Sequence, residues 1–539
     1  MKLASDILKE LVRVRSDTGT HYECAMGQKI YEMIQEHPYF QERVEQCGLW
    51  YNQDMLNRPV VWALRRGTSN RTVVLSAHYD AVEIDSYGVL KPYALDPDIL
   101  KDKMLNSSVI SDEMKKTIQN PGWMVGRGCA DCKSGIAENL FILFNSSNSE
   151  GNILFTAVCD EENLSAGARA SIGLFKYLKE RFHLNYRFAV ITEPDSYKNE
   201  NDAFSMAEGC VGKFLPVVVA RGIVSHGALM LYGLNSAYII SEVVRRMELN
   251  EKFHSCINNR HTHPATTLLM RDLKECYDIS LPEYSAAAFN ILYYRSECLS
   301  QYMQDIRRCC LEAADAAIAR YCRTYEDMAE CGAVCKADML QLTPEVYTTE
   351  ELKQLLRQRR PGFDAELRKI EAEIKNMMVD PKKTLQMLSV EYIRKLTALY
   401  ESVNPVVVIG VAPPFYPAVA NGGDYPDENR ILNTLVMELN AEGYAPVFRD
   451  PYNAGPTDLC YMFVNDLQKN LEIMSNMCIP ADIYDIDFRT LAEVGMPSIL
   501  MGATGKDVHK VSERVWIDDV DHKVPHILEK ILEIVFREG

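Results

Sequence analysis

Apolar segments of strand length in this chain repeatedly end in acidic residues or a histidine. RTVVLSAHYD ends in His78 and Asp80, GNILFTAVCDEE ends in a pair of glutamates, and YRFAVITEP closes on Glu193. Helical segments separate these strands, among them IAENLFILFNSS and a stretch from Ala166 to about Arg181. This alternation predicts an α/β fold with a mixed sheet between layers of helices. In such sheets functional sites lie just beyond the carboxyl ends of the strands. We therefore expect the polar residues at these strand ends to lie close together.

A chain of 539 residues is too long for one ordinary core, so at least two domains are expected. The pattern changes near Gly212, where β-rich sequence begins, and residues 299–400 are largely helical. Strand character resumes at NPVVVIGVA, before the Pro-rich APPFYPAV. The simplest architecture is an α/β domain of residues 1–211 and 416–539, interrupted by an inserted α+β domain, 212–415, with extra helices.

Composition narrows the classes of function. The net charge of −17 and pI near 5.2 argue against a nucleic-acid partner, because phosphates demand a basic face. No stretch reaches the roughly 18 apolar residues of a membrane span, and the N-terminus lacks the pattern of a signal peptide. Sixteen cysteines suit a reducing compartment if they are free thiols. A cytoplasmic location is the expectation.

Asp131 lies in GRGCADCKSG, a glycine-punctuated loop that opens a helix. Its carboxylate could bridge two metal ions, or it could simply cap the helix. Cys129 and Cys132 flank it as C-x-x-C, a spacing that lowers thiol pKa in redox proteins. A zinc ribbon would need a second such pair, which the sequence lacks. The carboxylate interpretation is preferred to both cysteine interpretations.

The other polar residues at strand ends indicate a metal site only when they are considered together. His78 and Asp80 share one face of a strand, so the carboxylate could orient the imidazole. Glu161 and Glu162 are adjacent at a strand end, and one could hold a metal while the other faces water. His509 follows GMPSILMGATG, another strand and glycine loop. Each has an ordinary explanation as a solvated polar turn, but five such motifs together indicate a two-metal site.

His226, in GIVSHGA, falls within the inserted domain. It could reach the site by domain closure or from another subunit and stabilise an oxyanion. A polar histidine on a β-strand is an equally good explanation of its spacing.

In this order the five motifs resemble the M20 family of metallopeptidases and amidohydrolases, which includes aminoacylases and succinyl-diaminopimelate desuccinylase. The long segment from His78 to Gly126 and the large helical insertion are similar to the arginine-utilisation, RocB-type branch. The resemblance implies a hydrolase that cleaves an amide or peptide bond in a dipeptide or N-acyl amino acid. It also implies two divalent cations, with Zn²⁺ favoured and Co²⁺ or Mn²⁺ compatible.

The resemblance further assigns roles to individual residues. His78 and Glu193 would hold one ion, Glu162 and His509 the other, and Asp131 would bridge them. Asp80 would orient the region of His78, and Glu161 would be the general acid/base. His226 matches the lid histidine that, in dimeric members, reaches the active site of the other subunit across the interface. The resemblance is therefore compatible with a homodimer formed through the inserted domain. The loop AGPTD, with Thr457 and Asp458, resembles the family's substrate-side loop.

The sequence departs from the family in two places, and the cysteines that flank Asp131, Cys129 and Cys132, are one of them. FNILYYR stands where many members carry D-x-R, whose arginine grips a substrate carboxylate. A catalytically silent metal-binding or interaction protein on the same fold is therefore the alternative hypothesis.

Overall fold

Two units make up the chain in this computed structural model. The structure describes residues 2–538 except 53, 148–149, 196–203, 258, 381, 422–425, 444–446 and 454. The first unit comprises Met1–Cys210, Val419–Asn465 and Asp487–Gly539, and the second comprises Val211–Ala418 and Asp466–Ile486. The units differ from the expected ranges chiefly in Asp466–Ile486, which groups with the second unit.

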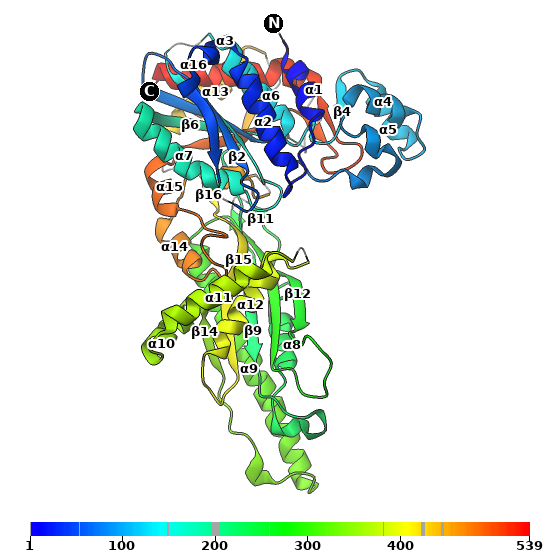
Figure 1. Cartoon of the computed structure of the whole chain (residues 1–539), viewed down its shortest axis with the longest axis vertical. Helices are drawn as coiled ribbons and strands as arrows, with labels where there is room; N and C mark the ends of the chain where they lie inside the picture. The colour runs from blue at the N-terminus through cyan, green and yellow to red at the C-terminus, as the bar shows by residue number, and fades with distance from the viewer. Residues whose placement is uncertain are drawn as a thin grey trace. The chain divides into compact units, whose positions relative to one another are not determined.

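An eight-stranded sheet forms the centre of the first unit (Figure 1), and its strands are mixed in direction, as the sequence predicted. Its order is β1-β2-β5-β3-β6-β18-β7-β17, and β5, β3, β6 and β18 run parallel to one another. The strands are β1 (Cys47–Tyr51), β2 (Pro59–Arg65), β3 (Arg71–His78), β5 (Asn152–Val158), β6 (Asn185–Thr192), β7 (Phe204–Ala207), β17 (Val447–Asp450) and β18 (Ser498–Met501).

Helices cover both faces of this sheet. Strand β3 is therefore buried at every position from Thr72 to His78. Alternate residues of β3, such as Leu75, join one core cluster with the apolar sides of five helices. These are α1 (Ala4–Val12), α2 (Tyr22–Gln35), α6 (Lys133–Asn145), α13 (Pro426–Ala441) and α16 (Val524–Glu538). Helix α7 (Ala166–Phe182) packs on β1, β2 and β5 outside that cluster, next to α15 (Phe488–Val494). A short helix, α3 (Pro38–Gln41), follows α2.

A small three-stranded sheet in the first unit positions two loops that the sequence singled out. Strands β4 (Trp123–Val125), β20 (Arg514–Trp516) and β19 (Gly505–Lys506) are antiparallel, in the order β19-β20-β4. The chain leaves β4 directly into the Asp131 loop, and the His509 loop connects β19 to β20. Their pairing therefore brings the Asp131 and His509 loops together although 378 positions separate the two residues (509 − 131).

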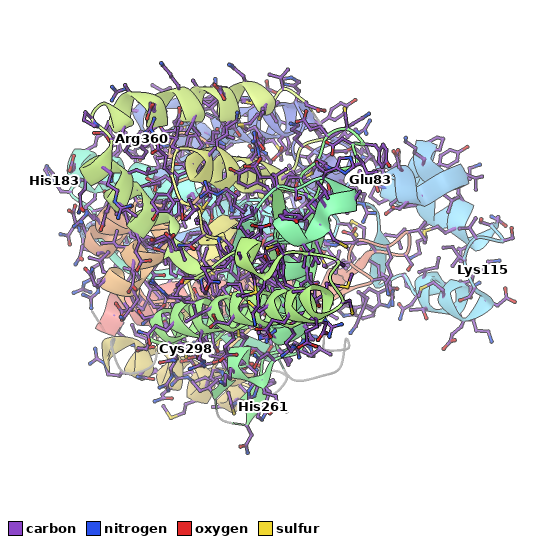
Figure 2. All side chains as sticks on the ribbon, turned by 90° about the horizontal axis from the view of Figure 1, so that it is seen from below. Glu83, Lys115, His183, His261, Cys298 and Arg360 are labelled. Carbon is purple, nitrogen blue, oxygen red and sulfur yellow. The ribbon has the colours of Figure 1, made fainter. Side chains whose placement is uncertain are left out.

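The segment that precedes β4 forms a small helical subdomain with its own apolar cluster. It contains η2 (Asp85–Tyr93), α4 (Pro97–Leu105) and α5 (Asp112–Gln119), and Tyr87, Leu100 and Ile118 are buried in its interior. Figure 1 shows α4 and α5 to one side of the large sheet, and Figure 2 labels Lys115 on the surface of this subdomain. This accounts for the long stretch between His78 and Gly126.

A five-stranded sheet organises the second unit, in the order β12-β13-β9-β15-β14. Successive residues of β9 and β15 are buried almost throughout, so both faces are covered. The strands are β9 (Gly212–Arg221), β12 (Thr266–Asp272), β13 (Tyr284–Tyr293), β14 (Glu345–Thr348) and β15 (Val406–Tyr416). The helices are α8 (Ser236–Met247), α9 (Cys298–Glu330), α10 (Thr349–Arg359), α11 (Phe363–Met377), α12 (Leu385–Ala398) and α14 (Leu467–Ser475).

Two features of this unit lay beyond the sequence prediction. Helix α14 packs against α9, and Met477 forms a bridge with Val411 of β15, which attaches the later segment to this unit. Strand β15 also continues through the Pro-rich APPFY, because its pairing with β9 resumes at Tyr416 after a register shift. Among the described residues, no helix combines the length and apolar character that crossing a membrane requires.

Candidate active site

Three neighbouring parallel strands bring their polar carboxyl ends to one edge of the large sheet. His78 is the last residue of β3, the loop after β5 carries Glu161 and Glu162, and Glu193 follows β6. The order β5-β3-β6 makes these strands direct neighbours. The convergence follows from parallel topology, in which carboxyl ends share an edge.

Asp131 lies between the two histidines predicted as ligands. Its Oδ1 is 3.0 Å from Nε2 of His78, and its Oδ2 is 3.3 Å from Nε2 of His509. His509 Nε2 also lies 2.8 Å from Oε1 of Glu162. One ligand atom each from Asp131, Glu162 and His509 falls within 4.8 Å of the others, a spacing that could hold a metal ion.

Asp80 connects the imidazole of His78 to the glutamate pair. Its backbone carbonyl is 3.1 Å from Nδ1 of His78, which leaves Nε2 free to act as a ligand in the neutral ring. Its carboxylate accepts the backbone N–H of Glu161 at 3.1 Å and that of Glu162 at 3.3 Å. The hydroxyl of Thr18 donates to the same carboxylate at 2.9 Å. Asp80 therefore fixes the loop from which both glutamates project.

Asp160, the first acid of the CDEE run, has a different role from Glu161 and Glu162. Asp160 adopts a left-handed backbone conformation, φ 67°, and its Oδ1 accepts from Arg58 at 2.6 Å. Arg58 also donates to the buried Glu23 at 2.8 Å. This buried group holds the turn after β5 in place. Sequence reasoning missed Arg58, because nothing near it in the chain marks its distant partner.

Burial and mutual repulsion oppose ionisation of the carboxyl groups that line the site. Burial, followed by repulsion from Glu193, raises the pKa of Glu161 well above its ordinary value. Burial also raises the pKa of Glu193, and it raises that of Asp458 to about 7. Asp131 behaves in the opposite way, because hydrogen bonds to His509 and His78 outweigh burial and lower its pKa.

The two imidazoles respond to this negative environment. Hydrogen bonds to Asp131 and Glu162 raise the pKa of His509 to about 10. Burial alone would lower the pKa of His78, yet its acidic neighbours raise it well above the ordinary value. The region contains two imidazoles against six carboxyl groups: Asp80, Asp131, Glu161, Glu162, Glu193 and Asp458.

This donor set fits divalent cations. Nitrogen and carboxylate oxygen are the ligands that Zn²⁺, Co²⁺ and Mn²⁺ accept, and added positive charge would relieve the repulsion. Glu193 Oε1 is buried and has no hydrogen-bond partner. A buried polar atom is normally paired, so this oxygen fits the role of a metal ligand. The two oxygens of Asp131 face different histidines, as a bridging carboxylate requires.

A short 3₁₀ turn in the first unit, η6 (Asp458–Tyr461), begins at Asp458 and is preceded by Thr457. The Thr457 hydroxyl accepts the N–H of Leu459 at 3.2 Å and so caps that turn. Asp458 is buried, and its charge contributes to the raised pKa values of Glu161 and Glu193. Thr457 thus supports the loop, whereas Asp458 interacts electrostatically with the carboxyl cluster.

His226 lies in the second unit and is exposed. It precedes the turn η3 (Gly227–Tyr232), and its Nδ1 accepts the backbone N–H of Ala228 at 3.1 Å. In the neutral ring the proton then resides on Nε2, which can donate.

The C-x-x-C pair around Asp131 is reduced and divided between separate partners. Cys129 Sγ donates to carbonyls of Met124 and Glu513, whereas Cys132 Sγ donates to the carbonyl of Thr192 at 2.9 Å. All sixteen cysteines of the chain are free thiols. Both members of the pair are fully buried, so packing accounts for them.

Two proteins of Bacillus subtilis (strain 168) align with nearly the whole chain. The protein named "Uncharacterized protein YqjN" is 25% identical over 541 residues, which cover 99% of this chain and 96% of that protein. "Protein RocB" is 28% identical over 546 residues, covering 96% and 92%. The expected similarity to the RocB-type branch is therefore confirmed.

Solved structures of peptidases share the fold. Aminopeptidase PepT from Bacillus cereus ATCC 10987 superposes with a TM-score of 0.52 at 12% identity, covering 99% of this chain and 98% of that one. The YXEP protein of Bacillus subtilis, a dinuclear metal-binding peptidase of the M20 family, gives 0.51 at 12% identity with the same coverage. The family model "Peptidase family M20/M25/M40" matches residues 74–533. This chain therefore belongs to the M20/M25/M40 family of peptidases.

Proposed function

We propose that this protein is a two-metal hydrolase that cleaves an amide or peptide bond in a small substrate, a dipeptide or an N-acyl amino acid. The observation that carries the proposal is the placement of Asp131 between His78 and His509, one carboxylate oxygen toward each. His78 and Glu193 would hold one cation, Glu162 and His509 the other, with Asp131 shared. Zn²⁺ suits this set best, and Co²⁺ or Mn²⁺ can replace it.

Bound cations would polarise the scissile carbonyl and acidify the attacking water. Glu161 is the proposed general base, because burial and repulsion raise its pKa and so strengthen its carboxylate as a proton acceptor. Its backbone is held by Asp80, so the carboxylate projects from a fixed position. Glu161 takes the proton from water as water attacks, and then delivers it to the departing amine.

His226 is the proposed donor to the oxyanion that forms on the substrate carbonyl. The contact between its Nδ1 and Ala228 leaves Nε2–H available for this purpose. The histidine could act within its own chain or in a partner subunit of a homodimer built through the second unit. Asp458, with Thr457 supporting its turn, is proposed to face the substrate.

The cytoplasm is the proposed site of action. Sixteen free thiols, several of them exposed, suit a reducing compartment.

The test is a substrate screen with a matched pair of variants. Metal-loaded protein is offered pooled dipeptides and N-acyl amino acids, and release of free amine is measured. Glu161→Gln should abolish hydrolysis with metal content unchanged, whereas the exposed Glu180→Gln should behave as the unmodified protein. Full activity in Glu161→Gln would refute the assigned base. Absence of turnover on every substrate would favour the silent metal-binding alternative.

His226 has its own test. His226→Ala should lower kcat while leaving KM and metal content almost unchanged, because the oxyanion forms only in the transition state. If mixing His226→Ala with Glu161→Gln restores activity, His226 acts across a dimer; if the mixture stays inactive, it acts within its own chain.

A further inference from the structure

We propose that the β10–β11 hairpin of the second unit carries a separate, non-catalytic metal site for a Zn²⁺-like cation, formed by His254, Cys256, His261 and His263. Strands β10 (Cys256–Ile257) and β11 (Arg260–His261) form this antiparallel hairpin. None of the four residues belongs to the candidate active site. The inference therefore stands independently of the proposed function.

The register of the hairpin places all four side chains on one face. Cys256 pairs directly with His261, and Thr262 N–H donates to the carbonyl of Ser255 at 2.9 Å, which extends the same register. Continued by one more residue, it sets His254 opposite His263. Side chains two apart on a strand point to the same face, and so do directly paired residues. The spacing H-x-C-x4-H-x-H thus gathers four ligand-type side chains.

The opposite face anchors the hairpin to its unit. Ser255 and Thr262 are buried, and the Thr262 hydroxyl accepts the N–H of Ser255 at 2.8 Å. Ser255 Oγ also accepts the N–H of Tyr294, just after β13, at 3.3 Å. Phe253, which precedes the hairpin, is fully buried against Tyr302. The backbone that carries the four ligands is therefore held in place before any cation arrives.

His261 contacts two of the other three candidate ligands, one through each of its ring nitrogens. His254 Nε2 is 2.8 Å from Nδ1 of His261, and the two rings stack with centroids 5.1 Å apart. Cys256 Sγ is 3.7 Å from Nε2 of His261. Tetrahedral Zn²⁺, with bonds of about 2.0–2.3 Å, needs donor atoms roughly 3.3–3.8 Å apart. The distance between Cys256 Sγ and His261 Nε2 already lies in this range, and we infer that side-chain rotation brings the other donors into it.

Exposure of this face gives an ion direct access. Cys256, His261 and His263 are exposed and His254 is half-buried; Figure 2 labels His261 at the surface of the second unit. One thiolate with three imidazoles is a borderline-to-soft donor set, which suits Zn²⁺ or Co²⁺. It contains no carboxylate, so Mg²⁺ and Ca²⁺, which prefer oxygen, should not compete.

Co²⁺ is the probe that separates this site from the candidate active site. A thiolate bound to Co²⁺ produces a near-ultraviolet charge-transfer band, whereas a site of imidazoles and carboxylates produces none. Titration of the full-length, metal-free protein under reducing conditions should produce this band with the intensity of one thiolate-bound Co²⁺ per chain, in addition to any Co²⁺ at the candidate active site. Zn²⁺ should displace it, and excess Mg²⁺ should not.

Variants identify the residues. Cys256→Ser should remove the band and leave any hydrolysis unchanged, while Cys276→Ser, at another exposed thiol of the same unit, should retain it. His261→Asn should weaken Co²⁺ binding by at least about 10-fold. His509→Ala should lose hydrolysis and keep the band. A failure of the proposed function can therefore be distinguished from a failure of the hairpin site. Absence of the band, or its persistence in Cys256→Ser, would overturn the proposal.

Discussion

Arg127 and Glu513, 386 positions apart in the chain, form a buried ion pair with 2.6 Å between Nη1 and Oε2. The second oxygen of Glu513 accepts the N–H of Ala130 at 3.3 Å and that of Asp131 at 3.4 Å. Arg127 Nη2 also donates to the backbone carbonyl of His509 at 3.3 Å. One ion pair therefore ties together the two loops that carry the proposed bridging carboxylate and the last histidine.

Glu513→Gln should be strongly destabilising, because it leaves the Arg127 guanidinium buried without a counter-charge. We expect the free energy of unfolding to fall by about 3–5 kcal/mol, measured by urea denaturation of the metal-free protein. The control is Glu493→Gln, which breaks the exposed pair with Lys176 and should cost less than about 1 kcal/mol. Equal effects of the two substitutions would contradict this assignment.

Asp80→Asn should impair catalysis more than substrate binding. The amide cannot accept both N–H groups that the carboxylate holds, so the loop bearing Glu161 and Glu162 loses its fixed position. We expect kcat to fall about 10- to 100-fold with little change in KM, measured at saturating metal. Thr18→Val removes only the hydroxyl donor and should cost less. A rise in KM alone would argue against a positioning role for Asp80.

Removal of metal should abolish hydrolysis and lower the melting temperature together. Without cations the carboxylates of the cluster repel one another. When the free metal concentration is 100 times the Kd of a site, binding at that site stabilises the fold by about 2.7 kcal/mol. The measurement is calorimetry before and after dialysis against a chelator, in the Cys256→Ser background, which excludes the proposed hairpin site. Zn²⁺, Co²⁺ or Mn²⁺ should restore both properties. Full activity in protein shown to be metal-free would refute the two-metal proposal.

Cys129 and Cys132 should resist thiol reagents in the native protein. Burial raises the pKa of both thiols well above the ordinary value, so almost no thiolate exists at neutral pH, and neither side chain is accessible. Brief alkylation followed by mass spectrometry should modify Cys276, Cys331 and Cys335, which are exposed, and spare the buried pair. Detection of a Cys129–Cys132 disulfide in active protein would revive the redox interpretation.

The sequence predicted the parts of the site that arise from local pattern. Strand ends are visible as apolar runs closed by polar residues, so His78 and Glu193 could be placed at one edge of the sheet. The predicted helix from Ala166 to about Arg181 corresponds to α7, Ala166–Phe182, because its apolar spacing is regular.

Residues that act through distant partners could not be predicted in this way. Arg58 and Arg127 resemble ordinary surface arginines in the sequence, and only the folded chain brings each to a buried carboxylate. The proposed hairpin site could not be predicted for a related reason. His254 and His263 become neighbours only through strand register, and a single sequence does not reveal which short segments pair.

Strand β18 lies between β6 and β7 in the large sheet, although residues 498–501 follow the whole second unit in the chain. During synthesis, β1, β2, β3, β5 and β6 therefore leave the ribosome long before the strand that covers the open side of β6. That side presents unpaired N–H and C=O groups for the time needed to translate some three hundred residues (498 − 192 = 306). An uncovered edge of this kind templates pairing with other chains. We therefore expect the newly made protein, more than the finished one, to depend on chaperones and to aggregate when synthesis stalls within the second unit.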